Sequence, residues 1–501
     1  MKPKIPSEVK TIAKELAQNG FEAYLVGGCV RDLVMGREPK DWDIATDANP
    51  EKIQKIFPDS VYENSFGTVG VKTEADDSRL KIVEITTFRL EGRYTDKRHP
   101  DEVTFASTIE EDLSRRDFTI NAIALRLTDD ERLITDNEKL FLEGGKLLVD
   151  PYDGQEDIKS GIIRTVGKAE DRFNEDALRM MRAARLATDL GFEIEVSTRQ
   201  AIEKLAGNLE AIAQERIRDE FMKMVMCSAA ARGIIFLEEL DLLRYVLPEL
   251  REGIGVDQNL HHIYTVFEHS VRALDYAAKQ NYSLEVRLAA LLHDVGKPRT
   301  KDGEGKNATF YNHEMLSARM TLRALDRMHF GKDVIEKVAH LVRWHMFYYN
   351  VDEVSAAGVR RFLVRVGPEN IDDLIKVREA DRIGSGTPKA VPYKLRHMLF
   401  MIEKVKKDPL SPKMLKLNGD DLMKLLKINP GPRVGQILAI LLEDVLDNPK
   451  NNTKAHLSAE AKKLNRLSDA ELLKLMRRAK DKANQIERGI EEEMKKKFFV
   501  K

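Results

Sequence analysis

The fold of this chain is decided by residues 24–46, which read Tyr-Leu-Val-Gly-Gly-Cys-Val-Arg-Asp-Leu-Val-Met-Gly-Arg-Glu-Pro-Lys-Asp-Trp-Asp-Ile-Ala-Thr. The stretch opens as a short apolar strand, Gly27 and Gly28 interrupt it, and a helical run follows over Val30–Met35. Glycines at the end of a strand let backbone N–H groups approach a phosphate closely. Arg31 stands three residues past Gly28, where it can meet a triphosphate. The stretch therefore predicts a phosphate site between a strand and a helix.

The second strand of this stretch carries two carboxylates, Asp41 and Asp43. Residues two apart on a strand point to the same face, so we expect the two carboxylates to project together, about 6–7 Å apart. That arrangement suits hard divalent cations that are held together with substrate phosphates. A lone Asp-x-Asp is usually a solvated strand end. The ordered combination of strand, Gly-Gly-x-x-Arg-Asp, helix and Asp-x-Asp is much more specific.

This combination resembles the signature of class II nucleotidyltransferases, the family of CCA-adding tRNA nucleotidyltransferases and bacterial poly(A) polymerases. The resemblance implies that Asp41 and Asp43 hold catalytic Mg²⁺ ions, and that Gly27, Gly28 and Arg31 contact the nucleotide. Each of these roles is an expectation that the structure can examine.

Three further segments extend the resemblance. Glu84 lies in the apolar strand Val83-Glu84-Ile85 and is a candidate third catalytic carboxylate, since relatives carry an acidic residue there; a solvent-facing Glu is the alternative. The charged segment Glu91–Asp112 is long for a loop and looks like the flexible loop of CCA- and A-adding enzymes, which CC-adding relatives lack. The following segment, Arg115–Ala122, is expected to open a helix. It matches the family's second motif, in which Arg116 would meet a phosphate and Asp117 a ribose hydroxyl.

Residues 171–190 are rich in helix formers and are followed by Gly191, so they predict one helix. Asp176, Arg179, Arg182 and Arg185 recur at intervals of three, which places one acceptor and three guanidinium groups on one helix face. An ordinary salt-bridged, solvent-facing surface would show the same spacing.

The pairing edges of cytosine and adenine favour a more specific interpretation. Both bases present an amino donor beside a ring-nitrogen acceptor, which a carboxylate next to a guanidinium complements. Guanine and uracil would leave buried groups unpaired. The run Glu175–Arg179 resembles the family's amino-acid template motif, Glu-Asp-x-x-Arg. By that resemblance Asp176 and Arg179 read the base, and Arg182 and Arg185 assist with the nucleotide. The segment Gln214–Val225 resembles the neck helix that supports the template.

A second constellation occupies the middle of the chain, where eight of the eleven histidines lie between residues 261 and 345. Imidazoles and carboxylates beside an apolar helix suit a divalent transition metal. The order of residues resembles the HD phosphohydrolase superfamily, in its version with ligands for two metals, and the candidate ligands are His269, His293, Asp294, His313, His345 and Asp381. Ni²⁺, Mn²⁺ or Co²⁺ would suit these ligands, and Lys297 could meet a phosphate.

The composition of the chain agrees with these expectations. Its 501 residues contain 82 Lys and Arg against 83 Asp and Glu, so an RNA-binding surface must come from local patches. Two cysteines and the lack of a long apolar run predict a cytoplasmic protein without a membrane segment. We predict an α+β fold in five parts: a nucleotidyltransferase head with a mixed sheet (1–146), a helical neck (147–255), an HD domain (256–388), a helical tRNA-binding tail (389–455) and a charged C-terminal helix (456–501).

These observations together predict an enzyme that adds CCA to the 3′ end of tRNA from CTP and ATP, with a second phosphohydrolase activity in the HD domain. A poly(A) polymerase or an A-adding nucleotidyltransferase is the nearest alternative. An HD phosphodiesterase with an RNA-binding head is the second, although Asp41 and Asp43 would then be idle. The oligomeric state is not predicted by the sequence.

Overall fold

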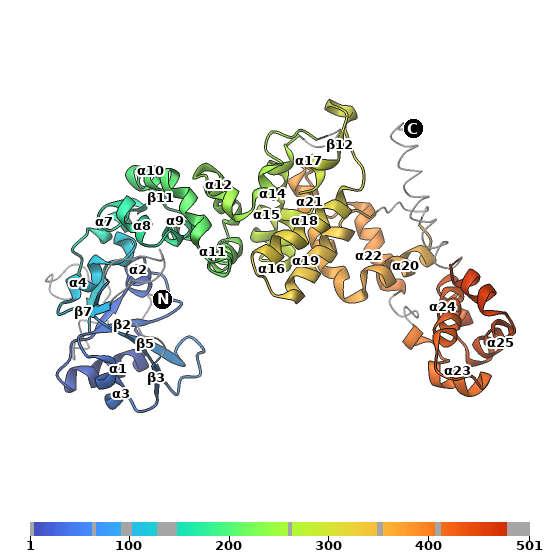
Figure 1. Ribbon diagram of the computed structural model, residues 1–501, viewed down its shortest axis with the longest axis horizontal. Helices are drawn as coiled ribbons and strands as arrows, with labels where there is room; N and C mark the ends of the chain where they lie inside the picture. Colours follow the sequence, from blue (N-terminus) through green and yellow to red (C-terminus); the bar gives the residue numbers. More distant parts are fainter. Residues whose placement is uncertain are drawn as a thin grey trace. The chain divides into compact units, whose positions relative to one another are not determined.

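The computed structural model describes residues 5–62, 67–91, 103–127, 148–258, 263–347, 354–405 and 412–477 (Figure 1). The described residues divide into two compact units. The first comprises residues 1–254 with the short segments 278–284 and 323–332, and the second comprises 255–277, 285–322 and 333–501. The five-part division of the sequence therefore stays a prediction.

The head is built on a mixed sheet, with the strand order β3-β4-β5-β2-β1-β8-β9 among the described residues. Strands β2 and β5 run parallel, whereas the other neighbours are antiparallel. The strands are β1 (Tyr24–Val26), β2 (Asp43–Thr46), β3 (Ser60–Tyr62), β4 (Thr68–Lys72), β5 (Ile82–Thr87), β8 (Ala124–Arg126) and β9 (Leu148–Val149). Strands β6 (Arg89–Glu91) and β7 (Val103–Phe105) form a separate ribbon. The predicted α+β class with a mixed sheet in the head is confirmed.

Helices cover both faces of this sheet because alternate strand residues are apolar on opposite sides. Leu25 and Ile44 pack in one cluster with residues of α1 (Ser7–Gln18) and α3 (Pro50–Ile56). Their neighbours Val26 and Ala45 pack in a second cluster with residues of α4 (Ile109–Ser114). The short helix α2 (Gly28–Val34) follows β1 directly. The two glycines therefore form the connection between a strand of the sheet and this helix.

Helix α4 begins inside the predicted loop Glu91–Asp112, because Thr108 and Glu111 form a reciprocal capping box at its start. Residues 92–102 of that loop lie outside the described residues. The expectation that Arg115–Ala122 opens a helix is wrong. Helix α4 ends at Ser114, and the segment contains only the 3₁₀ turn Thr119–Asn121 before it enters β8.

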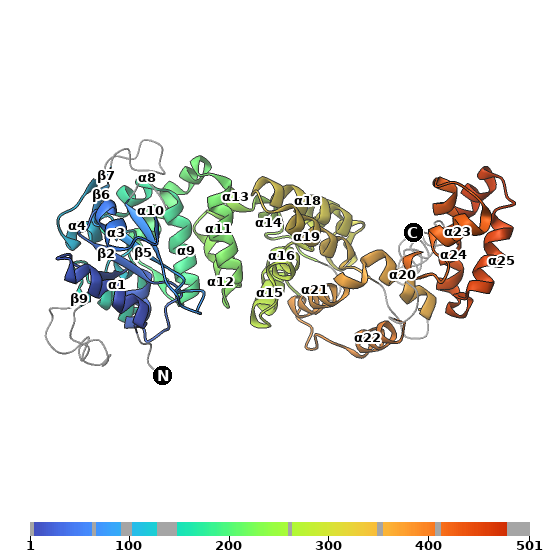
Figure 2. The same cartoon turned by 90° about the horizontal axis from the view of Figure 1, so that it is seen from below.

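The remaining helices of the first unit form the neck, in which α9 packs against α11 and α12 (Figure 2). They are α7 (Gly154–Ser160), α8 (Ala169–Glu175), α9 (Leu178–Leu190), α10 (Val196–Leu205), α11 (Gln214–Met226), α12 (Ala230–Glu239), α13 (Leu243–Val246) and α14 (Pro248–Arg251). The prediction of one helix over residues 171–190 is therefore wrong in one respect, because α8 and α9 are separate. Asp176 is extended (φ −141°, ψ 105°), and its Oδ1 accepts from the backbone N–H of Leu178 at 3.0 Å. An aspartate that bonds the backbone in this way competes with the helix.

The second unit is helical apart from the ribbon β12 (Lys301–Asp302) and β13 (Thr309–Phe310). Its helices are α15 (Val266–Lys279), α16 (Leu284–Leu292), α17 (Lys297–Thr300), α18 (His313–Arg327), α19 (Lys332–Trp344), α20 (Ala356–Val366), α21 (Ile371–Gly384), α22 (Tyr393–Val405), α23 (Gly419–Leu426), α24 (Pro432–Asp447) and α25 (Lys454–Leu464). The ends of α15 and α18, and the start of α16, belong by packing to the first unit. Residues 478–501 of the predicted charged helix lie outside the described residues. Within the part of the chain that the structure describes, no helix is long and apolar enough to cross a membrane.

Candidate active site and HD metal centre

Three carboxylates gather where β2 meets β5. Asp43 is the first residue of β2 and lies in register with Glu84 of β5, while Asp41 precedes the strand by two residues. Burial raises the pKa of Asp43 most, Asp41 and Glu84 raise it further, and Arg116 lowers it, giving a pKa of about 7. Asp43 is half-buried, whereas Asp41 and Glu84 are exposed. A cation bound to these carboxylates would relieve their mutual repulsion, so the residues fit a divalent metal.

Gly27 and Arg116 lie next to each other beside the carboxylate of Asp43. Gly27 has φ 76°, and a Cβ there would lie 3.0 Å from Nη1 of Arg116 and 3.9 Å from Oδ2 of Asp43. Only glycine both adopts this backbone conformation without strain and leaves this room. Arg116 is held by the fully buried Asp112, to which its Nη2 donates at 3.0 Å. The predicted residues Gly27, Asp43 and Arg116 are thus brought together.

The other two phosphate and ribose candidates are engaged with neighbours. Arg31 donates through Nη1 to Asn121 at 2.9 Å and through Nη2 to Asp32 at 2.7 Å. Its guanidinium lies beside the second glycine, because a Cβ on Gly28 would be 3.6 Å from Nη2 of Arg31. Asp117 accepts from Nε of Arg182 at 2.7 Å. Burial raises the pKa of Asp117, but Arg182 and Arg179 outweigh it and lower the pKa to about 2. Asp117 is therefore a fixed anion that joins the head to α9.

The two base-reading candidates, Asp176 and Arg179, each have a partner in the neck. Nη2 of Arg216 donates to Oδ2 of Asp176 at 2.7 Å, and Nη1 of Arg179 donates to Oε2 of Glu175 at 2.5 Å. The expectation that all four template residues share one helix face is corrected, because Asp176 lies in the break before α9. This break lets the Asp176 carboxylate turn toward α11, which carries Arg216.

Helix α11 supports the template through two charged side chains that sequence reasoning did not single out. Glu220, which is nearly fully buried, accepts from Nε of Arg185 at 2.5 Å, and Arg216 holds Asp176 as described above. Their spacing of four residues on one helix was the available signal. The supporting role expected of Gln214–Val225 is in agreement with these contacts.

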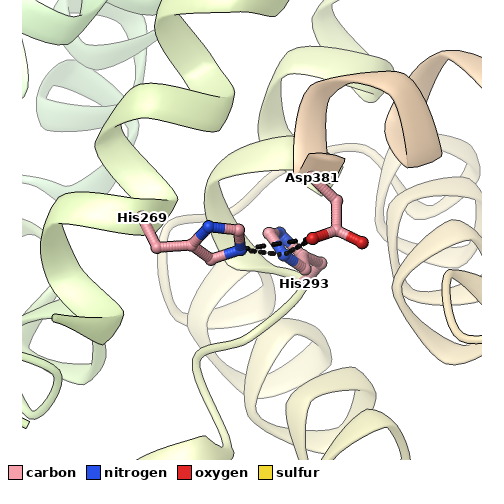
Figure 3. Close-up of side chains that lie close together, drawn as sticks. All are labelled: His269, His293 and Asp381. Carbon is pink, nitrogen blue, oxygen red and sulfur yellow. Dashed lines mark hydrogen bonds and ion pairs between the residues drawn. The ribbon is translucent and has the colours of Figure 1, made fainter. Parts of the chain in front are cut away.

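Six side chains meet in the interior of the second unit, and all six are the predicted HD ligands. Their exposed fractions run from 0% to 7%. They come from α15, the end of α16, the start of α18, the end of α19, and α21. Helix α21 approaches α15 very closely, because a Cβ on Gly384 would lie 2.9 Å from the carbonyl oxygen of His269. This close approach brings Asp381 to His269, as Figure 3 shows.

Asp294 lies between two groups of these ligands. Its Oδ2 is 3.1 Å from Nε2 of His269 and 3.2 Å from Nε2 of His293. Its Oδ1 is 3.2 Å from Nε2 of His313 and 3.6 Å from Nε2 of His345. Asp381 joins the first group, with Oδ1 3.4 Å from Nε2 of His269. The carboxylate of Asp294 therefore contacts one pair of imidazole nitrogens through Oδ2 and another pair through Oδ1.

The protonation pattern of this cluster fits metal ligation. Nδ1 of His293, His313 and His345 each lies 2.7–2.8 Å from a backbone carbonyl, which leaves Nε2 with a lone pair for a metal. Both oxygens of Asp294 and Nε2 of His313 are buried without an aligned hydrogen-bond partner. Burial lowers the pKa of His293, yet Asp294 and Asp381 raise it to about 10. These carboxylates thus hold a proton on the imidazole in the metal-free protein, and a bound divalent ion would displace that proton. The two carboxylates and the imidazole nitrogens of this cluster are therefore suitable ligands for divalent ions.

The described residues contain two sets of three side chains with ligand atoms within 4.8 Å of one another, and both lie in this cluster. They are His269, His293 and Asp381, and His293, Asp294 and His345. The carboxylates of Asp41, Asp43 and Glu84 in the head are not among these sets of described residues.

Comparison with known proteins agrees with this architecture. The family described as poly A polymerase head domain matches residues 23–164, the probable RNA and SrmB-binding site of polymerase A matches 191–254, and the HD domain matches 266–385. An A-adding tRNA nucleotidyltransferase of Deinococcus radiodurans is 36% identical, covering 84% of this chain and 91% of its own length. A CCA-adding enzyme of Enterococcus faecalis is 33% identical, covering 92% and 97%.

The structural comparison identifies the same group of proteins. The crystal structure of the Bacillus stearothermophilus CCA-adding enzyme in complex with CTP superposes with a TM-score of 0.67 at 30% identity, covering 92% of this chain and 97% of that one. The fold and the matched domains define a nucleotidyltransferase with an HD domain. The chain belongs to the tRNA nucleotidyltransferase/poly(A) polymerase family.

Proposed function

We propose that this enzyme adds CCA to the 3′ end of tRNA without a nucleic acid template. The observation that carries the proposal is the cluster of carboxylates of Asp41, Asp43 and Glu84, which lies beside Gly27 and Arg116 at the central strands β2 and β5 of the head sheet. In the proposed reaction the terminal 3′-hydroxyl of tRNA attacks the α-phosphate of CTP or ATP, and pyrophosphate leaves. Arg116, fixed by Asp112, would bind the phosphates, and Asp117 would position the ribose.

Mg²⁺ is the metal that we assign to Asp41 and Asp43, because oxygen ligands completed by substrate phosphates suit this ion best. When bound there it supplies charge neutralisation for the attacking and leaving oxygens. Arg31 would contact the triphosphate from the start of α2, where Asp32 and Asn121 already fix its guanidinium. The Mg²⁺ held by the carboxylates and the guanidinium groups would thus together neutralise the negative charge of the nucleotide.

Base selection falls to Asp176 and Arg179. Asp176 would accept from the exocyclic amino group of cytosine or adenine, and Arg179 would donate to the ring nitrogen. Arg216 fixes the Asp176 carboxylate at 2.7 Å, and Asp117 fixes Arg182. Such preorganisation makes the wrong base costly, since guanine and uracil present a donor where this site offers one.

Replacing Asp176 with alanine is expected to reduce the preference for CTP and ATP over UTP and GTP by about 10- to 100-fold, because the acceptor for the amino group is lost. The measurement is kcat/KM for all four nucleotides on a tRNA lacking CCA. Asp171→Ala provides the control, because Asp171 is an exposed aspartate of the neighbouring helix α8. An unchanged four-way ratio in Asp176→Ala would place base selection elsewhere.

An A-adding enzyme is the rival that one of the relatives favours, since the Deinococcus radiodurans protein has that name. The two activities differ in their acceptors. An A-adding enzyme extends a tRNA that already ends in CC and ignores CTP, whereas the proposed enzyme takes CTP onto a tRNA without any of the three nucleotides. The rates at which the wild-type enzyme extends these two acceptor tRNAs distinguish an A-adding enzyme from a CCA-adding enzyme.

A second activity is proposed for the HD cluster, in which Asp294 lies between two groups of imidazoles. The chemistry of the ligands favours Ni²⁺, Mn²⁺ or Co²⁺ over Mg²⁺. We propose hydrolysis of phosphate mono- or diesters, including 2′,3′-cyclic phosphates at damaged RNA ends. Such ends lack the free 3′-hydroxyl that the head requires, so one chain could repair an end and then extend it. A cytoplasmic location and a tRNA-binding tail around α23 and α24 complete the proposal.

A further inference from the structure

Lys297 is buried beside the HD cluster and is held there by a residue outside the matched HD domain. Its Nζ lies 2.6 Å from Oδ2 of Asp294 and donates to Oε1 of Gln258 at 2.6 Å. Lys297 and Gln258 are each 7% exposed, while the HD match begins only at residue 266. The lysine therefore sits between a candidate metal ligand and a buried amide.

The other end of the Gln258 side chain reaches the helix that carries His269. Nε2 of Gln258 donates to the carbonyl oxygens of Tyr264 and Thr265 at 3.2 and 3.4 Å. The carbonyl of Thr265 also accepts from the backbone N–H of His269 at 2.9 Å, in the first turn of α15. One amide group thus contacts both the lysine beside Asp294 and the turn that presents His269.

We propose that Gln258 is a positioning residue for the HD metal centre, holding Lys297 against Asp294 and fixing the first turn of α15 so that His269 and Asp294 keep their spacing of 3.1 Å. Nε2 of His269 and Oδ2 of Asp294 are the ligand atoms concerned, so a displacement of either side chain changes the ligand geometry. Groups that orient metal ligands in this way typically contribute 10- to 100-fold to metal affinity. The inference rests on the proposed metal-dependent function of the HD cluster.

Substitutions of Gln258 can separate the contact made by its Oε1 from the contacts made by its Nε2. Gln258→Leu removes the contacts to Lys297 and to both carbonyls with little change in volume. Gln258→Glu keeps an acceptor for Lys297 but removes the donor to Tyr264 and Thr265. Gln280→Leu makes the same chemical change at an exposed glutamine that follows α15 and serves as the matched control.

The test measures binding of Mn²⁺ to the metal-stripped, full-length protein, with all variants made in an Asp43→Ala background so that the head contributes no Mn²⁺ site. Thermal melting without metal confirms that each variant is folded. We expect Gln258→Leu to weaken Mn²⁺ binding about 10- to 100-fold, Gln258→Glu to fall between it and the parent, and Gln280→Leu to match the parent.

Three outcomes would overturn the inference, and they are distinguishable. Folded Gln258→Leu with the parent's affinity would overturn it while leaving the HD function intact. Equal losses of Mn²⁺ affinity in Gln258→Glu and Gln258→Leu would overturn the inference as stated, because the contact with Lys297 would then contribute nothing to metal binding. If the parent binds no Mn²⁺ and retains no transition metal on purification, the proposed HD function fails together with the inference.

Discussion

Asp43→Ala is expected to lower the rate of nucleotide addition by on the order of 10³-fold or more, while the protein remains folded. The loss follows from removing a metal ligand, which is worth several kcal/mol of charge stabilisation in the transition state. The fold should survive because burial and the neighbouring Asp41 and Glu84 raise the pKa of Asp43 to about 7. An acid whose folded-state pKa is raised destabilises the folded protein above its ordinary pKa, so its removal relieves repulsion.

The measurement is single-turnover addition of CMP and AMP, with thermal melting as the check on folding. Asp76→Ala changes an exposed aspartate in the loop between β4 and β5 and should behave as wild type. A near wild-type rate in Asp43→Ala would contradict the assignment of the carboxylate group. A lower melting temperature with loss of activity would instead indicate that Asp43 has a structural role.

His293→Ala combined with Asp294→Ala should abolish phosphoester hydrolysis and leave CCA addition unchanged. The reason is that these residues supply ligands to both groups of the HD cluster, whereas the head has its own carboxylates. Hydrolysis is measured on bis(p-nitrophenyl) phosphate and on 2′,3′-cyclic nucleotides, with Ni²⁺, Mn²⁺, Co²⁺ or Mg²⁺. Elemental analysis of the purified proteins reports whether the variant has lost its metal.

The controls for the HD variant address folding and coupling. Asp294→Asn keeps the volume of the buried side chain and removes its charge, and His397→Ala changes a histidine of α22 outside the cluster. A wild type without bound transition metal and without hydrolysis under any ion would mean that the cluster is a structural remnant. Loss of CCA addition in the folded double variant would show that the two sites are coupled.

Local sequence patterns predicted the elements that hold the sites. The glycine pair after an apolar strand correctly predicted β1 and α2, and Gly191 correctly predicted the end of α9, where it adopts φ 76°. The apolar helix expected beside the histidines is α16, in which Val286–Leu292 are buried, including Arg287. These features depend on backbone preferences and periodicity within a few residues, which a single sequence contains.

The features that escaped prediction depend on contacts between distant residues. Glu84 was a candidate third carboxylate only through the family resemblance, because the register that places it beside Asp43 joins strands about forty residues apart. The break at Asp176 depends on a side-chain cap and on Arg216 of another helix, whereas helix propensity alone favours one continuous helix. Gln258 can be identified as a candidate positioning residue only from its contact with Lys297, which lies 39 residues away in the sequence. Spacing within a motif cannot reveal such partners.

The most direct test of the central claim is to sequence the 3′ ends made by the purified wild-type enzyme on a tRNA that lacks CCA. With CTP and ATP together, we predict that most products end in CCA and stop there. With CTP alone they should end in CC, and UTP or GTP should add nothing. Products that carry only A on a CC-ending acceptor, or a long poly(A) tail on any acceptor, would contradict CCA synthesis by this chain.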